Sequence, residues 1–153
     1  MRKGMREMPV VNELKISFPS KSCNESIARM CVAAFIASED PTVSELAEIK
    51  TAVSEAVTNS IVHGYRGTLG TVSIHARFLD DGLLIIRVSD KGCGIPDVEK
   101  AREPLYTSAP EEERSGLGFS VMESFTDKLN VRSTVGKGTT VTLRRRLGVH
   151  NDE

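Results

Sequence analysis

The chain has 153 residues, of which 39% are hydrophobic and 27% are charged. This composition predicts one globular domain and excludes disordered and collagen-like proteins. The 20 basic and 21 acidic residues leave a formal net charge of −1. No positive field therefore covers the whole domain, and duplex nucleic acid is not expected as its main partner.

The cysteines and the apolar segments indicate where the protein acts. Cys23, Cys31 and Cys93 are an odd number of thiols at spacings that match neither a zinc ribbon nor a disulfide framework. No apolar stretch approaches the roughly 20 residues that span a bilayer, and residues 1–8 lack the apolar core of a secretion signal. We therefore expect a cytoplasmic protein without a membrane partner.

The first part of the chain is expected to contain one strand and two helices. Alternating apolar residues predict a strand over 12–18, and apolar residues at helical spacing predict a helix over about 22–37. Thr42 followed by Glu45 is a capping-box pair, so a second helix is expected to begin there. Its apolar side continues toward Gly64, where the helix should end.

The remaining chain is expected to contain two hairpins separated by a loop and a helix. In chain order these are strands 72–78 and 83–88, a loop over about 90–118, a helix over about 117–125, and strands 129–133 and 139–145. Consecutive hairpins predict a mixed, largely antiparallel sheet with the helices on one face. The predicted fold is a two-layer α+β sandwich, and a doubly wound parallel fold does not fit this order.

Glu55 and Asn59 lie one turn apart on the second predicted helix. They project away from the apolar stripe that should cover the sheet. No Lys or Arg stands three or four residues from Glu55, so a helical ion pair does not account for this carboxylate. A solvated helix face is the alternative interpretation, because surface carboxylates and amides are ordinary.

Asp90 ends an apolar strand and opens the run Asp90-Lys-Gly92-Cys-Gly94-Ile-Pro. A carboxylate at a strand end can accept hydrogen bonds, and residues without side chains let a planar ligand approach the backbone. Adenine, which carries an exocyclic amine donor, would fit such a site. An ordinary turn also explains aspartate and glycine at these positions.

The run Arg114-Ser-Gly116-Leu-Gly118-Phe leads directly into the predicted helix over 117–125. Free amides at a helix N-terminus, with an arginine beside them, can hold phosphate. A plain junction between loop and helix is the alternative. The spacings of the Rossmann and Walker phosphate loops are absent, as are the His-Arg-Asp and Asp-Phe-Gly signatures of ordinary protein kinases.

Taken together, these motifs resemble the N, G1, G2 and G3 boxes of the ATP-binding domain of gyrases, histidine kinases and MutL. In chain order they are Glu55-Ala-Val-Thr-Asn59, Asp90-x-Gly92-x-Gly94, Gly116-Leu-Gly118-Phe119 and Gly138-Thr139. The sequences of residues 54–65 and 113–123 are similar to those of one branch of this family, the serine-kinase anti-sigma factors. The resemblance extends over about residues 10–146, which leaves an N-terminal extension over 1–9 and a tail over 147–153.

The resemblance implies ATP and Mg²⁺ as ligands and gives each motif a role. Asn59 would help to hold the Mg²⁺ ion, and Glu55 would accept the proton of an attacking hydroxyl. Asp90 would bind the adenine amine, with Thr139 nearby. The other implied residues are Gly92 and Gly94 beside the base, Gly116 and Gly118 at the phosphates, and Arg114 at the terminal phosphate.

The resemblance also implies protein partners. At 153 residues the chain holds neither the helical acceptor domain of a histidine kinase nor the transducer domain of gyrase or MutL. The acceptor would be a serine of a separate anti-anti-sigma protein. As a homodimer with nucleotide bound, the chain would sequester a sigma factor, and Arg29 is a candidate contact. A solvated arginine is an equally good interpretation of Arg29.

Two other functions remain open at this point. One is a nucleotide-gated module that binds a sigma factor without catalysis, and the other is a detached ATPase domain of the histidine-kinase type. The motifs also leave open whether the sigma factor serves sporulation or a stress response.

Overall fold

Five strands form a single sheet in the order β1-β2-β3-β5-β4, and every neighbouring pair is antiparallel. The computed structural model describes residues 8–104 and 118–148. In chain order the elements are β1 (Val10–Pro19), α1 (Asn24–Ala37), α2 (Val43–Asn59), the π-helical turn η1 (Ser60–Gly64), β2 (Thr71–Leu79), β3 (Leu83–Asp90), α3 (Val98–Ala101), α4 (Gly118–Ser124), β4 (Lys128–Thr134) and β5 (Gly138–Arg146).

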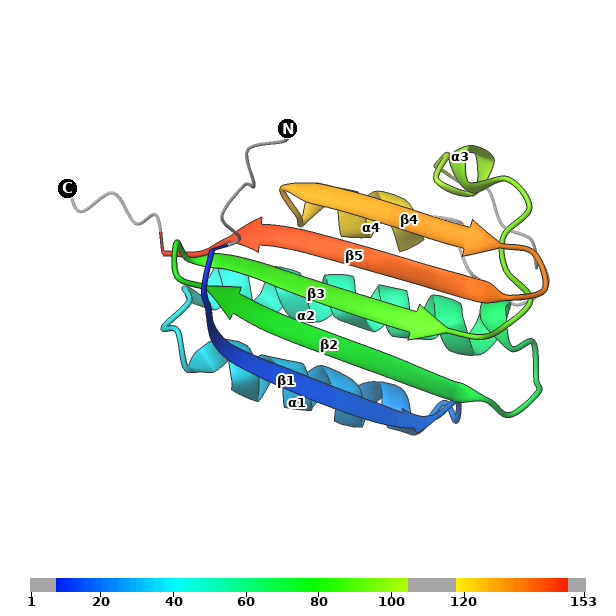
Figure 1. Cartoon of the computed structure of the whole chain (residues 1–153), viewed down its shortest axis with the longest axis horizontal. Helices are drawn as coiled ribbons and strands as arrows, with labels where there is room; N and C mark the ends of the chain where they lie inside the picture. The colour runs from blue at the N-terminus through cyan, green and yellow to red at the C-terminus, as the bar shows by residue number, and fades with distance from the viewer. Residues whose placement is uncertain (1–7, 105–117, 149–153) are drawn as a thin grey trace, which may run out of the picture.

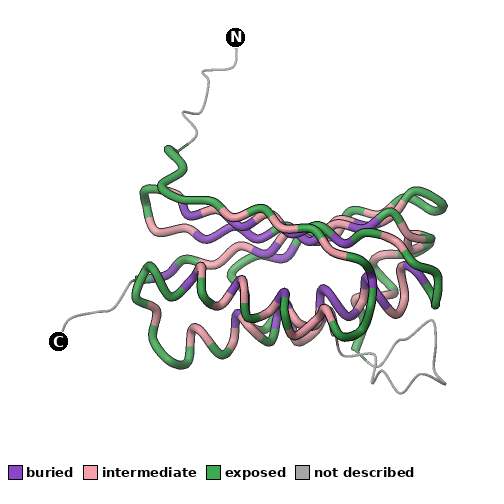
Figure 2. The backbone as a smooth tube through the Cα atoms, turned by 90° about the horizontal axis from the view of Figure 1, so that it is seen from below, coloured by how far each residue is buried: buried purple, intermediate pink, exposed green. Residues whose placement is uncertain are grey.

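The helices α1, α2 and α4 lie on one face of the sheet (Figure 1), and Figure 2 shows the two layers from the side. This arrangement confirms the predicted two-layer α+β sandwich. The sheet was expected to be mixed and largely antiparallel, and the described strands are antiparallel throughout. No helix within the two described ranges is long and apolar enough to cross a membrane.

The core lies between the two layers because side chains alternate along each strand. On β2, every second residue from Val72 to Phe78 is buried beneath the helices. The ring of Phe78 stacks on that of Phe35 in α1, with ring centroids 5.1 Å apart. Burial of one such large apolar side chain stabilises the fold by about 1.5–3 kcal/mol. The core therefore holds the helical layer firmly against the sheet.

The start of α2 follows the predicted capping box. The Thr42 hydroxyl oxygen accepts from the Glu45 amide at 3.0 Å, and the Thr42 amide donates to the Glu45 carboxylate at 2.9 Å. Such a cap stabilises a helix by about 1 kcal/mol. The helix runs to Gly64 as expected, but its last five residues, Ser60–Gly64, form a π-helical turn. Turns of this kind are common at functional sites.

In its described part, which ends at residue 104, the predicted loop over 90–118 contains a short helix, α3, which the spacing of apolar residues did not predict. It begins after Asp97, whose Oδ1 accepts from the Lys100 amide at 3.1 Å. Four residues are too few for a hydrophobic period to be visible, so only the capping aspartate could have indicated it. The helix predicted over 117–125 is observed as α4, Gly118–Ser124.

Candidate functional site

Glu55 and Asn59 lie beneath the first residue of α4. A Cβ atom added to Gly118 would stand 3.2 Å from Nδ2 of Asn59 and 3.3 Å from Oε2 of Glu55. Both side chains are partly buried, so they face α4 and not bulk solvent alone. Glycine at this position leaves open the space that a methyl group would fill. The structure thus brings together the parts of two predicted motifs that are far apart in the chain.

The Glu55 carboxylate forms no ion pair within the described part of the chain. The neighbouring Ser54 hydroxyl instead donates to Glu25 of α1. Glu25 also pairs with Arg29, with 3.8 Å between Oε1 and Nη1. A carboxylate without a cationic partner keeps its oxygens able to accept a hydrogen bond from a ligand. Arg29 itself lies on α1, linked through Glu25 to the residue that precedes Glu55.

Asp90 forms the second part of the candidate site, at the end of β3. Its side chain is buried, with 8% exposed. Oδ1 accepts from the Gly92 amide at 2.9 Å and from the Thr139 amide at 3.3 Å. Among the described residues no donor reaches Oδ2, which leaves this oxygen able to accept from a ligand. The backbone therefore sets the orientation of the carboxylate, as a recognition group requires.

Thr139 is the strand neighbour of Asp90, since the two residues are directly paired across β3 and β5. Its hydroxyl lies 2.8 Å from that of Ser133 on β4, and the Ser133 hydroxyl also accepts from the Ile95 amide at 2.7 Å. Ser133 was not predicted as a site residue. The sequence feature that could have indicated it is its alternation with Leu129 and Val131, which point toward the helices, because a polar residue in this phase faces the interior.

Gly64, at the end of the π-helical turn, joins the two parts of the site. A Cβ atom on Gly64 would lie 3.2 Å from the Asp90 carboxylate, and one on Gly92 would lie 2.2 Å from the Gly64 carbonyl oxygen. The Cys93 amide donates to that same carbonyl at 2.8 Å. The end of the Glu55–Asn59 helix is therefore packed on the turn that follows Asp90. The sequence indicated Gly64 only as a helix end.

Close packing and backbone conformation both require glycine at position 94. Its φ is +77°, in the region that favours glycine, and a Cβ atom there would stand 2.4 Å from the Thr134 carbonyl oxygen. The adjacent Cys93 carbonyl accepts from the Gly136 amide at 2.8 Å. The turn after Asp90 is thus held from both sides. The roles predicted for Gly92 and Gly94 beside a bound base stay predictions.

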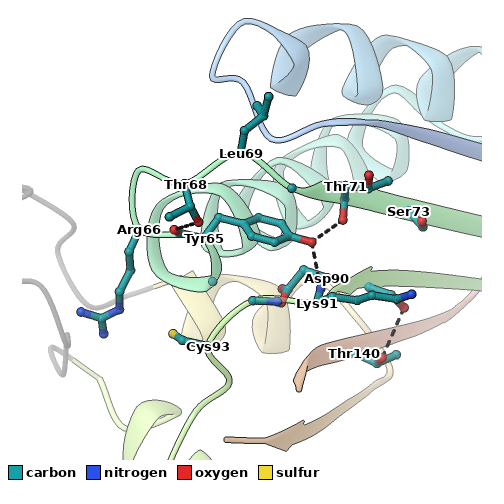
Figure 3. Close-up of a pocket in the computed structure, with 14 residues that line it drawn as sticks. Tyr65, Arg66, Thr68, Leu69, Thr71, Ser73, Asp90, Lys91, Cys93 and Thr140 are labelled. Atoms are coloured by element: carbon teal, nitrogen blue, oxygen red, sulfur yellow. Dashed lines mark hydrogen bonds between the residues drawn. The ribbon is translucent and has the colours of Figure 1, made fainter. Parts of the chain in front are cut away.

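A pocket of about 970 Å³ borders this region (Figure 3), but it is not the site defined by Glu55 and Asn59. Its lining includes Asp90 and Gly92, and it omits Glu55, Asn59, Gly118 and Thr139. Ser73, Ser89 and Thr140 line it, and they alternate with buried core residues along their strands. The pocket therefore opens on the sheet face that the helices leave uncovered. Of the remaining predicted site residues, Arg114 and Gly116 lie outside the described ranges.

The chain matches a known family of ATP-binding domains. The family model of the histidine kinase-like ATPase domain matches residues 18–145, which include both parts of the site and the sandwich apart from most of β1. The fold and site thus define a histidine kinase-like ATPase domain, and such a domain implies nucleotide binding.

Relatives that match over nearly their full length identify the family within this class. The anti-sigma F factor of Geobacillus kaustophilus (strain HTA426) is 54% identical, over 89% of this chain and 93% of its own length. Those of Thermoanaerobacter sp. (strain X514) and Halalkalibacterium halodurans are 52% and 55% identical and are covered over 98% and 93% of their lengths. These matches span 92% and 89% of this chain. The chain belongs to the anti-sigma F factor family.

Solved structures agree on the fold. The RsbU and RsbW domains of Rv1364c from Mycobacterium tuberculosis match with a TM-score of 0.66 at 22% identity, over 90% of this chain and 33% of that one. The histidine kinase domain of the Erythrobacter litoralis EL346 blue-light activated histidine kinase matches with a TM-score of 0.51 at 26% identity. That match covers 67% of this chain and 45% of the kinase chain.

Proposed function

We propose that this chain is an ATP-dependent serine protein kinase that phosphorylates an anti-anti-sigma factor. With nucleotide bound, the same chain, as a homodimer, sequesters the sporulation sigma factor, sigma F. The observation that carries the proposal is the position of Glu55 and Asn59 beneath Gly118, on a helix whose end packs against Asp90. The names of the relatives support the sigma-factor partner.

The nucleotide would lie with its base at Asp90 and its phosphates at Gly118. Oδ2 of Asp90 would accept from the exocyclic amine of adenine, while Oδ1 remains held by the backbone. Gly118 opens α4, so the preceding Gly116 and Arg114 would meet the phosphates and the terminal phosphate, respectively. The motifs at Asp90 and at Gly118 would therefore supply the two ends of the nucleotide site.

The residues at Gly118 also fit a magnesium ion. Asn59 offers a hard amide oxygen, and Gly118 leaves free the space that a side chain would fill. No group of three His, Cys, Asp or Glu side chains gathers within 8–104 and 118–148. The ion would therefore depend on Asn59 and on the phosphates of ATP, in keeping with the preference of Mg²⁺ for few protein ligands beside substrate phosphates. When bound, it would neutralise charge on the phosphates.

Glu55 would act as the general base. The serine hydroxyl oxygen of the partner would form a bond to the γ-phosphorus, and the bond from that phosphorus to the bridging oxygen of ADP would break. ADP leaves with the electron pair, and the hydroxyl proton passes to the Glu55 carboxylate. The absence of an ion pair to Glu55 among the described residues supports this role.

The exposed face of α1 is the proposed contact for the protein partners. Ile27 and Met30 are 58% and 67% exposed, and at positions i and i+3 they lie on the same side of α1. Arg29, between them in sequence, is partly exposed on the same helix. Methionine and arginine are among the residue types enriched at protein interfaces.

The decisive experiment combines the chain, ATP, Mg²⁺ and the anti-anti-sigma protein, and then identifies the phosphorylated residue by mass spectrometry. We expect phosphoserine on the partner. Glu55→Gln should slow the transfer by about 100-fold or more and leave ADP affinity unchanged. Glu39→Gln, at an exposed position, is the matched control and should transfer at the normal rate.

Other outcomes would overturn the kinase assignment. Transfer to histidine would favour a detached ATPase domain of the histidine-kinase type. ATP-dependent binding of sigma F with no transfer by the unmutated chain would favour the non-catalytic binding module.

A further inference from the structure

We propose that Tyr65 is a positioning residue for nucleotide recognition, whose phenol hydroxyl fixes the Asp90 turn relative to the helix that carries Glu55 and Asn59. The proposal rests on nucleotide binding as proposed above, and it does not require phosphoryl transfer. Tyr65 touches no reacting atom, so its effect would pass through Asp90.

The Tyr65 hydroxyl is bonded on both sides. It donates to the Thr71 carbonyl at 2.5 Å and accepts from the Lys91 amide at 2.9 Å. Figure 3 shows this hydroxyl between the start of β2 and the residue that follows Asp90. The phenol therefore connects the end of the π-helical turn to two strands of the sheet.

The ring of Tyr65 is also held in place. Tyr65 is only 8% exposed, and a Cβ atom on Gly70 would stand 2.1 Å from the ring carbon Cε1. The ring thus lies directly on the backbone of Gly70, and no other residue type fits there. A ring held on its face and bonded at its hydroxyl has a single orientation.

Two consecutive residues of the helix end therefore hold both sides of the Asp90 turn. Tyr65 binds the amide of Lys91, and Gly64 binds the amide of Cys93. The Gly64 contact uses backbone atoms and fixes one point. The Tyr65 contact supplies a second point from the same helix end, in addition to the Gly136 amide that binds the Cys93 carbonyl. Asp90 precedes Lys91, so this bond reinforces the orientation that the Gly92 and Thr139 amides give to the Asp90 carboxylate.

Removal of the hydroxyl should affect recognition more than folding. Lys91 and Thr71 are exposed, so water can replace the lost bonds, and the ring still packs on Gly70 in a phenylalanine variant. The Asp90 turn would lose one of the bonds that hold it, so the carboxylate would be less firmly oriented toward the adenine amine. GTP carries a carbonyl oxygen at the corresponding position, and this oxygen cannot donate to Asp90. The affinity ratio of ATP to GTP is therefore the specific readout.

The test measures ATP and GTP binding to the full chain by titration calorimetry, well below the melting temperature. Tyr65→Phe should weaken ATP binding by about tenfold, the scale of one hydrogen bond, and should lower the ratio of ATP to GTP affinity by a similar factor. An unchanged ratio would overturn the proposal.

Ser20→Ala is the matched control. The buried Ser20 hydroxyl accepts from the Gly70 amide at 2.9 Å and donates to the Thr68 carbonyl at 3.3 Å. It anchors the same loop from β1 without reaching Lys91. Ser20→Ala should leave the ratio unchanged. An equal fall in both variants would mean that general loosening of the loop is responsible, which would overturn the proposal.

Amide hydrogen exchange in the unmutated chain gives a second test that needs no variant. The Lys91 amide should be protected although its side chain is exposed, and exchange at the rate of a free amide would contradict the bond to Tyr65. If the unmutated chain binds neither nucleotide, the proposed function fails, whereas the exchange result still tests the bond.

Discussion

Gly92 crosses the backbone of Gly64 at a separation that only glycine at position 92 permits, because a Cβ atom on Gly92 would lie 2.2 Å from the Gly64 carbonyl oxygen. This crossing joins the helix that carries Glu55 and Asn59 to the strand that ends at Asp90. The two halves of the candidate nucleotide site are therefore held together by this backbone contact and by the Tyr65–Lys91 bond. A substitution there tests whether the halves work as a unit.

Gly92→Ala should damage both the fold and the site. The added methyl group would overlap backbone atoms, which cannot move aside as a flexible side chain can, so we expect a loss of about 1–3 kcal/mol in the free energy of unfolding. ADP affinity should fall together with it, because Asp90 and the helix end would separate. Urea unfolding and titration calorimetry measure the two effects.

Gly67→Ala is the control for this substitution. Gly67 has a φ of +84° and nothing within 4 Å of an added Cβ, so the variant should lose about 1–2 kcal/mol through backbone strain alone and bind ADP normally. If both variants bound ADP equally well, the crossing would have no role in the site.

Asn59→Ala should remove the magnesium-dependent part of ATP affinity. We expect a loss of several kcal/mol in the free energy of ATP binding when Mg²⁺ is present, because charge-assisted coordination is lost. In EDTA the variant and the unmutated chain should bind almost equally. Asn130→Ala, on β4, removes a different amide, whose oxygen accepts from Arg144, and should change neither value. Unchanged binding of Asn59→Ala with Mg²⁺ would contradict the role of Asn59.

The features that local sequence predicts well are those set by neighbours along the chain. The capping box at Thr42 and Glu45 depends on residues three apart, and the helical spacing of Glu55 and Asn59 is equally local. The π-helical turn at Ser60–Gly64 was not predicted, because an i→i+5 bond leaves no residue pattern distinct from that of an α-helix. Only its end, Gly64, was visible as a helix terminator.

The partners that complete the site could not be predicted, because they depend on contacts between distant segments. Ser133 reaches Thr139 through the register of the last hairpin, and Tyr65 reaches Lys91 through the approach of the helix end to β3. Register and layer packing are set by the whole core. Residue types alone indicated Asp90, since an aspartate at the end of an apolar strand stands out, but not the amides that orient it.

Two carboxylates, Glu13 on β1 and Asp81 on the turn between β2 and β3, should make stability depend on pH in the acid range. The hydrogen bond with His75 holds the pKa of Glu13 below its ordinary value, and the bond with Arg146 does the same for the pKa of Asp81. A lowered pKa in the folded state contributes stability that is complete above the unfolded value, about 4, and is lost as pH falls through the folded value.

Glu13→Gln and Asp81→Asn should therefore be slightly less stable than the unmutated chain at pH 7, and each difference should shrink as pH falls from about 4 toward 2. Both side chains are well exposed to solvent, so the differences will be small. Midpoints of urea unfolding measured across this range would show the trend. A difference that stayed constant down to pH 2 would contradict it.

Asp90→Asn should impair recognition of adenine without removing the internal bonds of the turn. The variant keeps an oxygen to accept from the Gly92 and Thr139 amides, so the fold should persist. The amide nitrogen then stands where Oδ2 was and presents donors to the adenine amine, which is itself a donor. We expect ADP binding to weaken by about 100-fold, as for a charged hydrogen bond left unpaired. Asp80→Asn, on the exposed turn between β2 and β3, should bind ADP normally. Equal ADP affinities of Asp90→Asn and the unmutated chain would show that this carboxylate does not meet the base.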